Sequence, residues 1–509
     1  MRIVPELNVV KKDWRKVDIK IALCYPNVYR AGMTGLTVKL LYALLNMRED
    51  TLCERFFVPT LREGWRSLES NQPLNRFDIV AFTLQYEEDY PNVVRMLLES
   101  DIPPRIEDRR EDDPLIIAGG PCATGNPEPL ADYIDLFIIG EAEPVVDQII
   151  DEVRTSRKPR KRIEELADLK GAYSPGISDT AERVWVQNLN EALHPLAQQI
   201  PLVEDDSPYM PIFGKAFTVE VVRGCDRSCR FCLIGHIWRP KRERTLEKVI
   251  SIIDEGVKYT PVNKISLIGA SLFAYRHLEE LCEGIVSRGF ELSVSSLSPE
   301  SVTEGLADSL RKGNQRTVTL APDAATVKMR CVIGKMMKEE SLINAAKILL
   351  SHGVKQLKMY FMIGLPEETS EDIIAIADLS KKIADIGYGP RSIHLSINPL
   401  IPKPHTPFQW VKTPSVPYLR ECLKIIRREL KNDGRFVINT LDPRHVQIQA
   451  LLSLGDREVG KAIEFVARYG GGLGTWRRAF REHGIELERY IGEKDREEPM
   501  PWDRIRVHP

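Results

Sequence analysis

The sequence lacks an apolar run near the roughly 20 residues that a membrane-spanning helix needs. Its first residues, MRIVPELNVVKKDWRK, contain no apolar core of a signal peptide. It also lacks a charge excess, because 71 Lys and Arg face 73 Asp and Glu. This balance argues against a surface made wholly for nucleic acid or acidic membrane. We therefore expect a cytoplasmic protein with no membrane partner, and a nucleic acid partner is disfavoured.

Cysteine is scarce as well, with nine residues in a chain of 509. Three of the nine fall within eight residues, which indicates metal ligation in a reducing compartment and not a disulfide framework. The chain is also too long for one hydrophobic core, and 43% of its residues are apolar. We therefore expect two large domains with smaller additional pieces.

The first part of the chain alternates strand-like and helix-like patterns. The apolar runs DIKIALCYP, FDIVAFTLQ, PLIIAGGP and IDLFIIGEAE predict buried strands, and TGLTVKLLYALLN and YPNVVRMLLES predict helices. This alternation predicts a doubly wound, Rossmann-like parallel sheet over residues 1–153, with ligand sites at the carboxyl ends of its strands. Residues 154–213 are rich in proline and charge, which predicts a connector.

A second alternating series begins at Phe217. The runs FTVEVVRG, NKISLIGAS, FELSVSSLS, RTVTLAP, KQLKMYFMIGLP and SIHLSINPLIP predict six strands separated by helices. They favour a partial (β/α)6 barrel over residues 214–410, with the reactive centre at the carboxyl ends of its strands. Residues 411–509 predict a mainly helical C-terminal region. The expected fold class is therefore α/β throughout the two large domains.

The motif RGCDRSCRFC directly follows the first barrel strand and has the spacing C-x3-C-x2-C at Cys225, Cys229 and Cys232. Three thiolates can ligate three irons of a [4Fe-4S] cluster and leave the fourth iron open for a chelating substrate. A zinc knuckle completed by His236 is the alternative, although structural zinc sites normally have four protein ligands. The spacing, with Phe231 before the last cysteine, resembles the radical S-adenosylmethionine (SAM) superfamily, which implies that the three cysteines hold the cluster and act in catalysis.

The resemblance extends over about residues 213–410 and implies a set of SAM contacts. LIGAS follows the second barrel strand, where the superfamily presents backbone groups to the methionyl amine, although it departs from the usual GGE. APDAATVKMRCVIGK resembles the APEAGT segment of a cobalamin-linked subgroup, and KMYFMIGLPEET resembles the strand that packs the adenine. The residues implied to bind SAM are Phe231, Gly269, Ala270, Ser271, Ser296, Asp323, Arg330, Met362 and Ile363.

Radical SAM enzymes with a doubly wound domain before the barrel often use it to hold cobalamin. Thr83-Leu84-Gln85 and Gly119-Gly120 match the S-x-L and GG segments of the cobalamin domain of methionine synthase, and glycines there let a bulky ligand approach the backbone. No G-x-G-x-x-G follows the first strand, which disfavours a dinucleotide. A Rossmann-like domain that holds nothing is the remaining alternative. The residues implied to bind cobalamin are Tyr25, Asn27, Val28, Tyr29, Arg30, Gly32, Thr83, Leu84, Gln85, Gly119 and Gly120.

Tyr29 is the informative departure from that pattern. It stands where methionine synthase has the His of D-x-H-x-x-G, which ligates cobalt. Without a strong lower ligand, both reduction of cobalt and homolytic loss of a methyl group should be easier. We expect Tyr29 to pack under the corrin and to exclude a lower ligand.

The subgroup resemblance covers most of the chain and implies a cobalamin-dependent C-methyltransferase. Such an enzyme methylates an unactivated sp3 carbon through methylcobalamin and a 5′-deoxyadenosyl radical. Overall similarity and length resemble the methanogen enzymes that methylate a glutamine of methyl-coenzyme M reductase. The expected partners are therefore a protein or peptide substrate, possibly methyl-coenzyme M reductase, and an electron donor.

Three alternatives stay open at this point. A cobalamin radical SAM enzyme can rearrange or cyclise its substrate without methyl transfer, and a non-catalytic carrier would bind both cofactors without cleaving SAM. A methylthiotransferase would need a second cluster, for which Cys24, Cys53 and Cys122 are the candidates. Their apolar surroundings favour buried free thiols.

Overall fold

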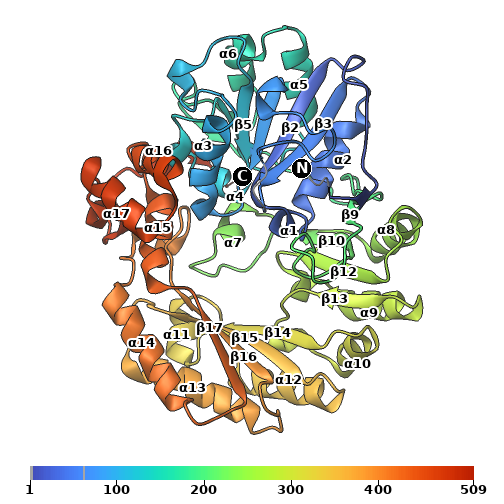
Figure 1. Ribbon diagram of the computed structural model, residues 1–509. Coiled ribbons are helices and arrows are strands. Elements are labelled where there is room, and N and C mark those ends of the chain that lie inside the picture. The colour runs from blue at the N-terminus through green and yellow to red at the C-terminus, as the bar shows by residue number, and fades with distance from the viewer. Residues whose placement is uncertain (1–3, 61–63, 509) are drawn as a thin grey trace.

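An α/β domain formed by the first part of the chain lies against a partial barrel, and C-terminal helices flank both (Figure 1). The computed structural model describes residues 4–60 and 64–508. The predicted α/β fold class is confirmed. No helix in the described part of the chain is long and apolar enough to cross a membrane.

The N-terminal sheet has six strands in the order β3-β2-β4-β5-β6-β7, and all neighbours are parallel except β6 and β7. Successive side chains of a strand point to opposite faces. Ile21 and Leu23 of β2 therefore pack with α2 and α5, whereas Ala22 and Cys24 pack with α3 on the other face. The main elements are β2 (Ile19–Val28), β3 (Thr51–Val58), β4 (Ile79–Thr83), β5 (Leu115–Gly119), β6 (Leu136–Ile138), α2 (Thr37–Met47), α3 (Tyr90–Leu98) and α5 (Val146–Arg154).

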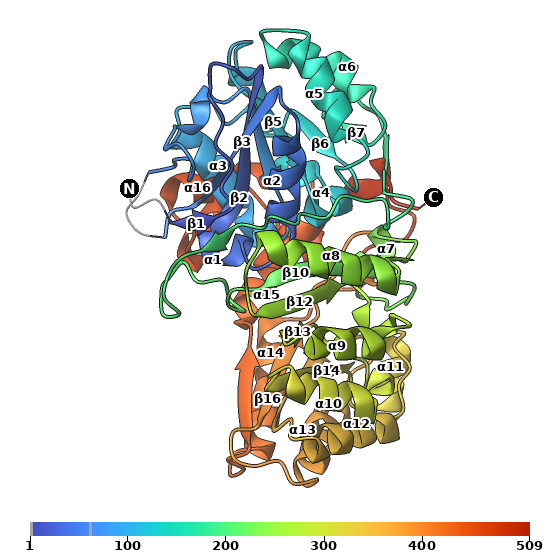
Figure 2. The ribbon, with the colours of Figure 1, turned by 90° about the vertical axis from the view of Figure 1, so that its right-hand side faces the viewer.

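Residues 154–213 form short strands that pair with strands from distant parts of the chain. β7 extends the N-terminal sheet, β8 pairs with β18, and β9 pairs with β1. The segment after β7 runs along the boundary between the sheet domain and the barrel (Figure 2). The elements are α6 (Ile163–Ala167), β7 (Ala172–Tyr173), β8 (Ala181–Glu182), β18 (Ile505–Arg506), β9 (Ile200–Pro201) and β1 (Glu6–Leu7).

The barrel consists of two four-stranded sheets, β11-β10-β12-β13 and β14-β15-β16-β17, joined by a bridge between Leu297 and Leu320. The six predicted strands are present, and β17 adds a further parallel strand beside β16 in the region predicted to be helical. The strands are β10 (Phe217–Arg223), β11 (Arg242–Glu243), β12 (Lys264–Gly269), β13 (Glu291–Val294), β14 (Thr317–Asp323), β15 (Gln356–Ile363), β16 (Ile393–Pro399) and β17 (Phe436–Thr440). The outer helices include α8 (Leu246–Tyr259), α9 (Leu278–Ser287), α10 (Glu304–Lys312), α12 (Glu339–Ser351) and α13 (Ser370–Ala384).

The C-terminal helices return to the N-terminal domain. Ile463 and Val466 of α16 share an apolar core with Val93 and Leu97 of α3. The Tyr133 hydroxyl donates a hydrogen bond to the carbonyl of Gly460 (2.9 Å). These helices therefore cover one face of the sheet domain. Their bounds are α15 (Pro443–Leu454), α16 (Val459–Tyr469) and α17 (Leu473–Glu482), whereas α14 (Val416–Glu429) packs in the core of the barrel.

The contact between the sheet domain and the barrel buries a lysine. Lys39 of α2 is 3% exposed, and its ammonium group donates to the Thr218 hydroxyl of β10 (3.3 Å). Burial lowers the pKa of Lys39 to about 8, and only the more distant charge of Glu6 opposes this shift. The interface therefore carries a charged group that is poorly compensated at neutral pH.

Lys39→Met is expected to stabilise the protein at pH 7. Below pH 8 the folded and unfolded states both hold the Lys39 proton, and the cost of burying the charge is fully present. As pH rises from about 8 toward about 10.4, the folded state releases its proton first, so wild-type stability rises. A tenfold change in proton affinity is worth about 1.4 kcal/mol, so the gain from Met at pH 7 is on the order of 3 kcal/mol.

Urea unfolding at pH 7.0 and 9.5 checks this prediction. The difference in stability between Lys39→Met and wild type should shrink at the higher pH, whereas the exposed Lys16→Met control should show no such change. An equal difference at both pH values would contradict the assignment of a perturbed Lys39.

Candidate active site

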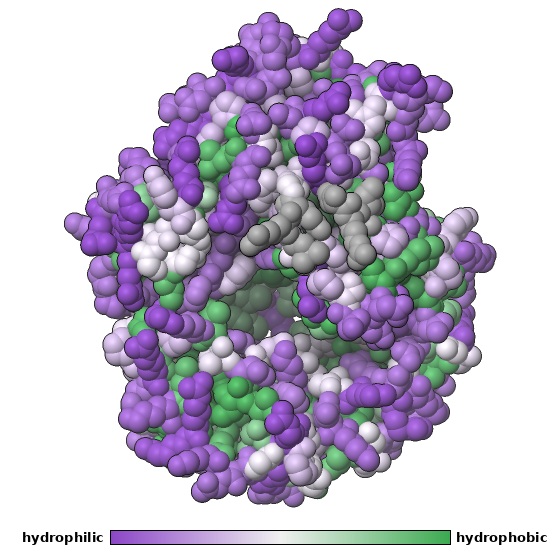
Figure 3. All heavy atoms as spheres, in the orientation of Figure 1, coloured by the Kyte–Doolittle hydropathy of each residue, from purple (hydrophilic) through white to green (hydrophobic). Residues whose placement is uncertain are grey.

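A cavity of about 650 Å³ lies between the N-terminal sheet domain and the barrel. Its walls come from β2, β4, β5 and β6, from α2 and α5, and from the ends of β10 and β12. The part against the sheet is an apolar slot, and the part against the barrel reaches the cysteine motif. On the face drawn in Figure 3 the surface is hollowed between the two domains. Residues of the slot include Leu23, Leu40, Ile79, Ala81, Ile117 and Ile138.

The three motif cysteines lie on the loop between β10 and α7 (Leu233–Ile237), and Cys225 and Cys232 line the cavity. The loop starts at Gly224, where φ is +84° and a Cβ would lie 2.2 Å from the carbonyl oxygen of Trp238, so only glycine fits. The amide of Cys232 donates to the carbonyl of Cys229 (3.1 Å), which makes the loop turn back on itself. The sequence therefore brings the three thiols to the carboxyl end of the first barrel strand, as predicted.

The charges of the neighbouring motif thiols affect the pKa of Cys229. Burial raises the pKa of Cys229 to about 11, against the opposing charge of Lys335. Cys225 and Cys232 act in the same direction as burial, which puts the three groups within electrostatic reach of one another. Among the described residues, no three His, Cys, Asp or Glu side chains form a ready-made metal site. The fit to a [4Fe-4S] cluster rests on the donor set: three soft thiol ligands on one short loop.

His236 does not support the zinc alternative. Its Nε2 lies 3.1 Å from the carbonyl oxygen of Cys229, within hydrogen-bond distance. The imidazole therefore supports the loop backbone and does not join the three thiols.

Several predicted SAM residues lie at the cavity or close to the motif. Gly269 ends β12, Ala270 follows it, and both line the cavity together with Cys225. A Cβ on Gly269 would lie 2.8 Å from the carbonyl oxygen of Val222, so glycine permits the close approach of β12 to β10. The buried Ser271 hydroxyl donates to the carbonyl of Gly224 (2.9 Å) and joins the two turns.

Phe231 and Met362 contact a separate apolar cluster that includes Met329, Ile333 and Leu365. Asp323 ends β14 with φ +59° and forms a short ion pair with Lys335. Ser296 is half-buried just after β13. These residues surround the mouth of the barrel without lining the cavity.

Two predicted SAM residues require correction. Arg330 is 1% exposed, and its guanidinium donates to the backbone carbonyls of Ala324, Ala325 and Met337 at 3.0 to 3.1 Å. Ile363 is 0% exposed and belongs to the barrel core. Arg330 therefore stabilises the segment after β14, and neither side chain is placed to contact SAM.

Four predicted cobalamin residues line the cavity: Thr83, Gln85, Gly119 and Gly120. Gly120 has φ +106°, and a Cβ there would lie 2.7 Å from the carbonyl oxygen of Leu84. Only glycine therefore allows the turn after β5 to lie this close to the backbone of Leu84. Thr83 and Trp238 also line the cavity, but the Thr83 hydroxyl and the Trp238 indole nitrogen are themselves buried and have no hydrogen-bond partner. The apolar lining of the slot fits a large, mostly neutral ligand.

The segment from Tyr25 to Gly32 does not line this cavity. β2 runs on to Val28, and the expected loop is a single turn, α1 (Tyr29–Gly32). The Tyr29 hydroxyl donates to Glu6 Oε1 (2.8 Å), and its ring packs edge-on against Phe57. The expectation that Tyr29 packs under a corrin is therefore wrong. A buried cluster of charged residues binds the Tyr29 hydroxyl, and the ring packs in the core of the sheet domain. That cluster is Glu6, Arg55 and Glu69, with Arg55 at 2.6 and 2.7 Å from the two carboxylates.

Asn27 of that segment also has a partner away from the cavity. The Asn27 amide donates to Asp89 (2.8 Å). Leu84, from the next predicted segment, is 1% exposed and packs in the core on the α3 face of the sheet.

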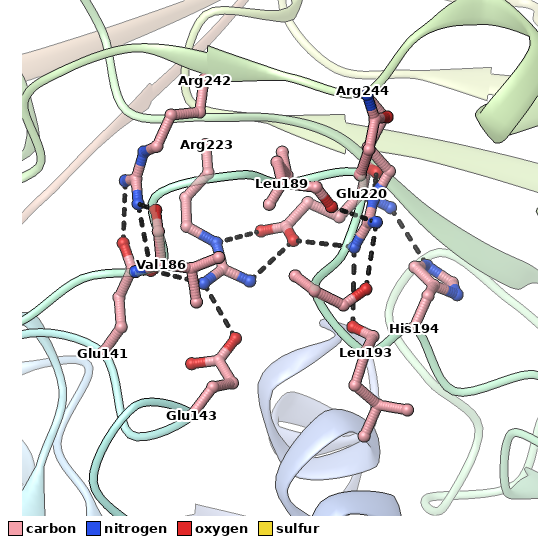
Figure 4. Close-up of polar contacts among 12 residues, drawn as sticks. Glu141, Glu143, Val186, Leu189, Leu193, His194, Glu220, Arg223, Arg242 and Arg244 are labelled. Carbon is pink, nitrogen blue, oxygen red and sulfur yellow. Dashed lines mark hydrogen bonds and ion pairs between the residues drawn. The ribbon is translucent and has the colours of Figure 1, made fainter.

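A charged network that the sequence motifs did not reveal borders the cavity (Figure 4). Arg223, the last residue of β10, contacts Glu141 (2.7 Å) and Glu143 (2.8 Å) of the sheet domain. Its other nitrogens donate to Glu220 at 2.8 and 2.9 Å. Arg242 adds a second contact to Glu141 (2.8 Å). The network joins the loop after β6 to the strand that carries the cysteine motif.

The network keeps the Glu141 carboxylate charged. Burial alone would raise the pKa of Glu141, but Arg223 and Arg242 outweigh it and lower the pKa. The only local signal was the pair of acidic residues in GEAE after a strand, and nothing in the sequence near them identifies Arg223 as their partner.

The structure does not support a second cluster on the N-terminal cysteines. Cys24 and Cys53 lie on adjacent strands but on opposite faces of the sheet, in different apolar cores. Cys122 is buried in the same core as Cys24. Burial raises the pKa of all three thiols, so they are inert buried groups and not metal ligands.

Comparison with known proteins agrees with this geometry. A family model of the radical SAM superfamily matches residues 219–380, and a model of the N-terminal part of radical SAM proteins matches residues 37–175. The chain therefore has a radical SAM domain, which implies a [4Fe-4S] cluster and SAM. The chain belongs to the family of the uncharacterized protein MJ0966 of Methanocaldococcus jannaschii, with 32% identity over 454 residues, 88% of this chain and 92% of the relative.

Two solved structures share the fold. The radical SAM methyltransferase TsrM from Kitasatospora setae, with cobalamin and a [4Fe-4S] cluster bound, superposes with a TM-score of 0.56 at 15% identity and covers 92% of this chain and 99% of its own. The cobalamin-dependent SAM radical enzyme OxsB, with aqua-cobalamin bound, gives 0.55 at 12% identity over 92% of this chain and 71% of its own. At these identities the likeness concerns the fold.

Proposed function

We propose that this protein is a cobalamin-dependent radical SAM C-methyltransferase. The observation that carries the proposal is the continuity of the cavity. One space reaches from the apolar slot of the sheet domain to Cys225 and Cys232 on the cluster loop. Two cofactors held at its ends would therefore face the same substrate, which is the arrangement that radical methyl transfer requires.

The slot has the properties that the nucleotide tail of cobalamin requires. Its walls are aliphatic side chains of the parallel sheet and of α2 and α5. A flat, neutral aromatic base would bury well between them. TsrM and OxsB bind cobalamin within the same overall fold.

The residues of this chain hold and orient the reactants. Cys225, Cys229 and Cys232 would hold the cluster, and the backbone of Gly269 and Ala270 lies beside them at the end of β12. When bound, the cluster supplies an electron for reductive cleavage of SAM, and cobalamin supplies a methyl carrier. The Arg223 network fixes the sheet domain on the barrel, so that the distance between the two ends of the cavity is set by packed, ion-paired side chains.

For the substrate we propose a protein or peptide, with a glutamine of methyl-coenzyme M reductase as the candidate. The support is the resemblance of the whole chain to the methanogen glutamine methyltransferases. The hollowed face in Figure 3 would admit an extended peptide between the domains.

The test is an anaerobic reaction of reconstituted enzyme, cobalamin, SAM, a reductant and a glutamine-containing peptide from methyl-coenzyme M reductase. Mass spectrometry would quantify 5′-deoxyadenosine, S-adenosylhomocysteine and peptide mass together. We expect both SAM products to rise in step with a peptide that gains one methyl group. Formation of deoxyadenosine without S-adenosylhomocysteine would favour rearrangement or cyclisation over methyl transfer. Formation of neither product would favour a non-catalytic carrier.

A further inference from the structure

We propose that the positive charge of Lys335 sets the reduction equilibrium of the [4Fe-4S] cluster that the cysteine motif would hold, and that Asp323 is the counter-charge that limits this effect. The two side chains form the ion pair at the end of β14. The proposal rests on the cluster position used in the proposed function, but on neither cobalamin nor methyl transfer. It gives a role to two charged groups beside the cluster loop.

The backbone just before the lysine lies directly on the cysteine motif. The amide of Arg230 donates to the carbonyl of Ile333 (2.9 Å). Gly334 has φ +68°, and a Cβ there would lie 3.1 Å from the carbonyl oxygen of Ser228. These two contacts fall on either side of the middle cysteine of the motif in the chain. The segment that leads into the lysine therefore lies against the most buried of the three thiols.

The side chain of Lys335 reaches from that segment to the end of β14. Its ammonium group donates to the carbonyl of Ala321 (2.6 Å) and pairs with the Asp323 carboxylate. The Lys335 and Asp323 side chains are only 17% and 14% exposed. Charges that are largely withdrawn from solvent are weakly screened, so both act more strongly on their surroundings than surface charges do.

Both charges act on the motif thiols. Burial raises the pKa of Cys229 to about 11, and Lys335 opposes this shift. Asp323 raises the same pKa by a smaller amount than Lys335 lowers it. Burial also raises the pKa of Cys232, and Asp323 adds to that shift. The effect of the lysine on the middle cysteine is therefore reduced by its counter-charge but not cancelled.

A positive charge beside an iron–sulfur cluster favours its reduced form, because reduction adds one negative charge. Lys335 should therefore make the cluster easier to reduce, and Asp323 should oppose this effect. In the experiment below, one electron passes from the radical anion SO2•− of dithionite, which becomes SO2, to the cluster, which goes from the 2+ to the 1+ state. No proton moves and no bond of the cluster forms or breaks.

The test is a redox titration of the reconstituted protein without SAM or cobalamin. Dithionite lowers the solution potential stepwise through mediator dyes, and the electron paramagnetic resonance signal of the reduced cluster gives the fraction reduced. In Lys335→Gln, the ratio of reduced to oxidised cluster at a fixed potential should fall about tenfold, a shift of about 59 mV to lower potential for one electron. In Asp323→Asn, the ratio should rise about threefold, because Lys335 then acts without its counter-charge.

The variants are matched in shape or in charge. Asp323 has φ +59°, a conformation that Asn also tolerates, so Asp323→Asn removes the charge without straining the backbone further. Lys335→Arg keeps the charge and should keep the wild-type ratio. Lys347 is exposed on α12, and Lys347→Gln should leave the ratio unchanged because solvent screens a surface charge. Opposite shifts in the two charge-removing variants separate an electrostatic effect from a disturbed loop.

A wild-type potential in Lys335→Gln would overturn the proposal, and so would shifts of Lys335→Gln and Asp323→Asn in the same direction. If Lys335→Gln does not retain iron, Asp323→Asn serves as the test, and a ratio that does not rise would overturn the proposal. Absence of methyl transfer in the reaction described above would leave this result unaffected. A wild-type protein that binds no cluster would instead overturn the proposed function together with this proposal.

Discussion

Cys229→Ala should remove both the cluster and all 5′-deoxyadenosine formation. Cys229 is the middle ligand of the motif and the most buried of the three thiols. Without it, two thiolates would remain for a cluster that needs three protein ligands when SAM takes the fourth iron. Iron per chain should fall from about four to near zero after anaerobic reconstitution, and SAM should remain intact.

Cys282→Ala is the matched control for that experiment. Cys282 is 0% exposed in α9, far from the motif in sequence, and has an ordinary buried thiol. Its variant should keep about four irons and wild-type SAM cleavage. Retention of a redox-active cluster by Cys229→Ala would contradict the assignment, and a wild-type content near eight irons would reopen a second cluster.

Ala81→Phe should prevent cobalamin from binding while the iron–sulfur cluster stays in place. Ala81 lies on β4 in the wall of the slot, and a phenyl group there would occupy the space between the sheet and α2. Because the slot is a pre-formed cavity, filling it costs less stability than overpacking a filled core, about 1 kcal/mol or less. We expect the affinity for cobalamin to fall at least 100-fold, about 2.7 kcal/mol.

Equilibrium titration followed by visible absorbance would measure that loss. Ala375→Phe places the same group at a half-buried alanine of α13, outside the cavity, and should leave cobalamin affinity unchanged. The iron content of both variants should equal that of wild type. Wild-type affinity in Ala81→Phe would show that the nucleotide tail does not lie in this slot, and failure of wild type to bind cobalamin would favour a sheet domain without a cofactor.

The elements that the sequence predicted well are those with local signals. The four apolar runs of the N-terminal sheet and the six of the barrel are strands. The N-terminal runs and the first barrel run are nearly continuous and buried, and the other barrel runs alternate buried and partly exposed residues. Two strands gave no such signal. β3 contains the buried charged residues Glu54 and Arg55, which interrupt its apolar run, and β17 is an edge strand that is only partly buried.

The candidate site likewise contains residues that local sequence signals predict and residues that such signals do not predict. The cysteine loop and the glycines of the two strand ends are recognised from spacing and from turns that only glycine can make, as Gly224 and Gly120 show. The roles of Tyr29 and Arg330 could not be predicted, because their partners are far in sequence or are backbone carbonyls. The pairing of Arg223 with Glu141 spans two domains, and only the folded chain brings these side chains together.

The return of α15 and α16 to the sheet domain limits how this architecture can be recombined. Asn126, which follows β5 and the short helix after it, donates to the carbonyls of Ser453 and Gly455 at 3.1 and 2.8 Å. The α3 face is covered by residues that come more than three hundred positions later in the chain. The sheet domain is therefore not a transplantable module, since on its own it would expose an apolar face to water. A chimera designed to give another barrel this domain would have to carry residues 443–469 with it.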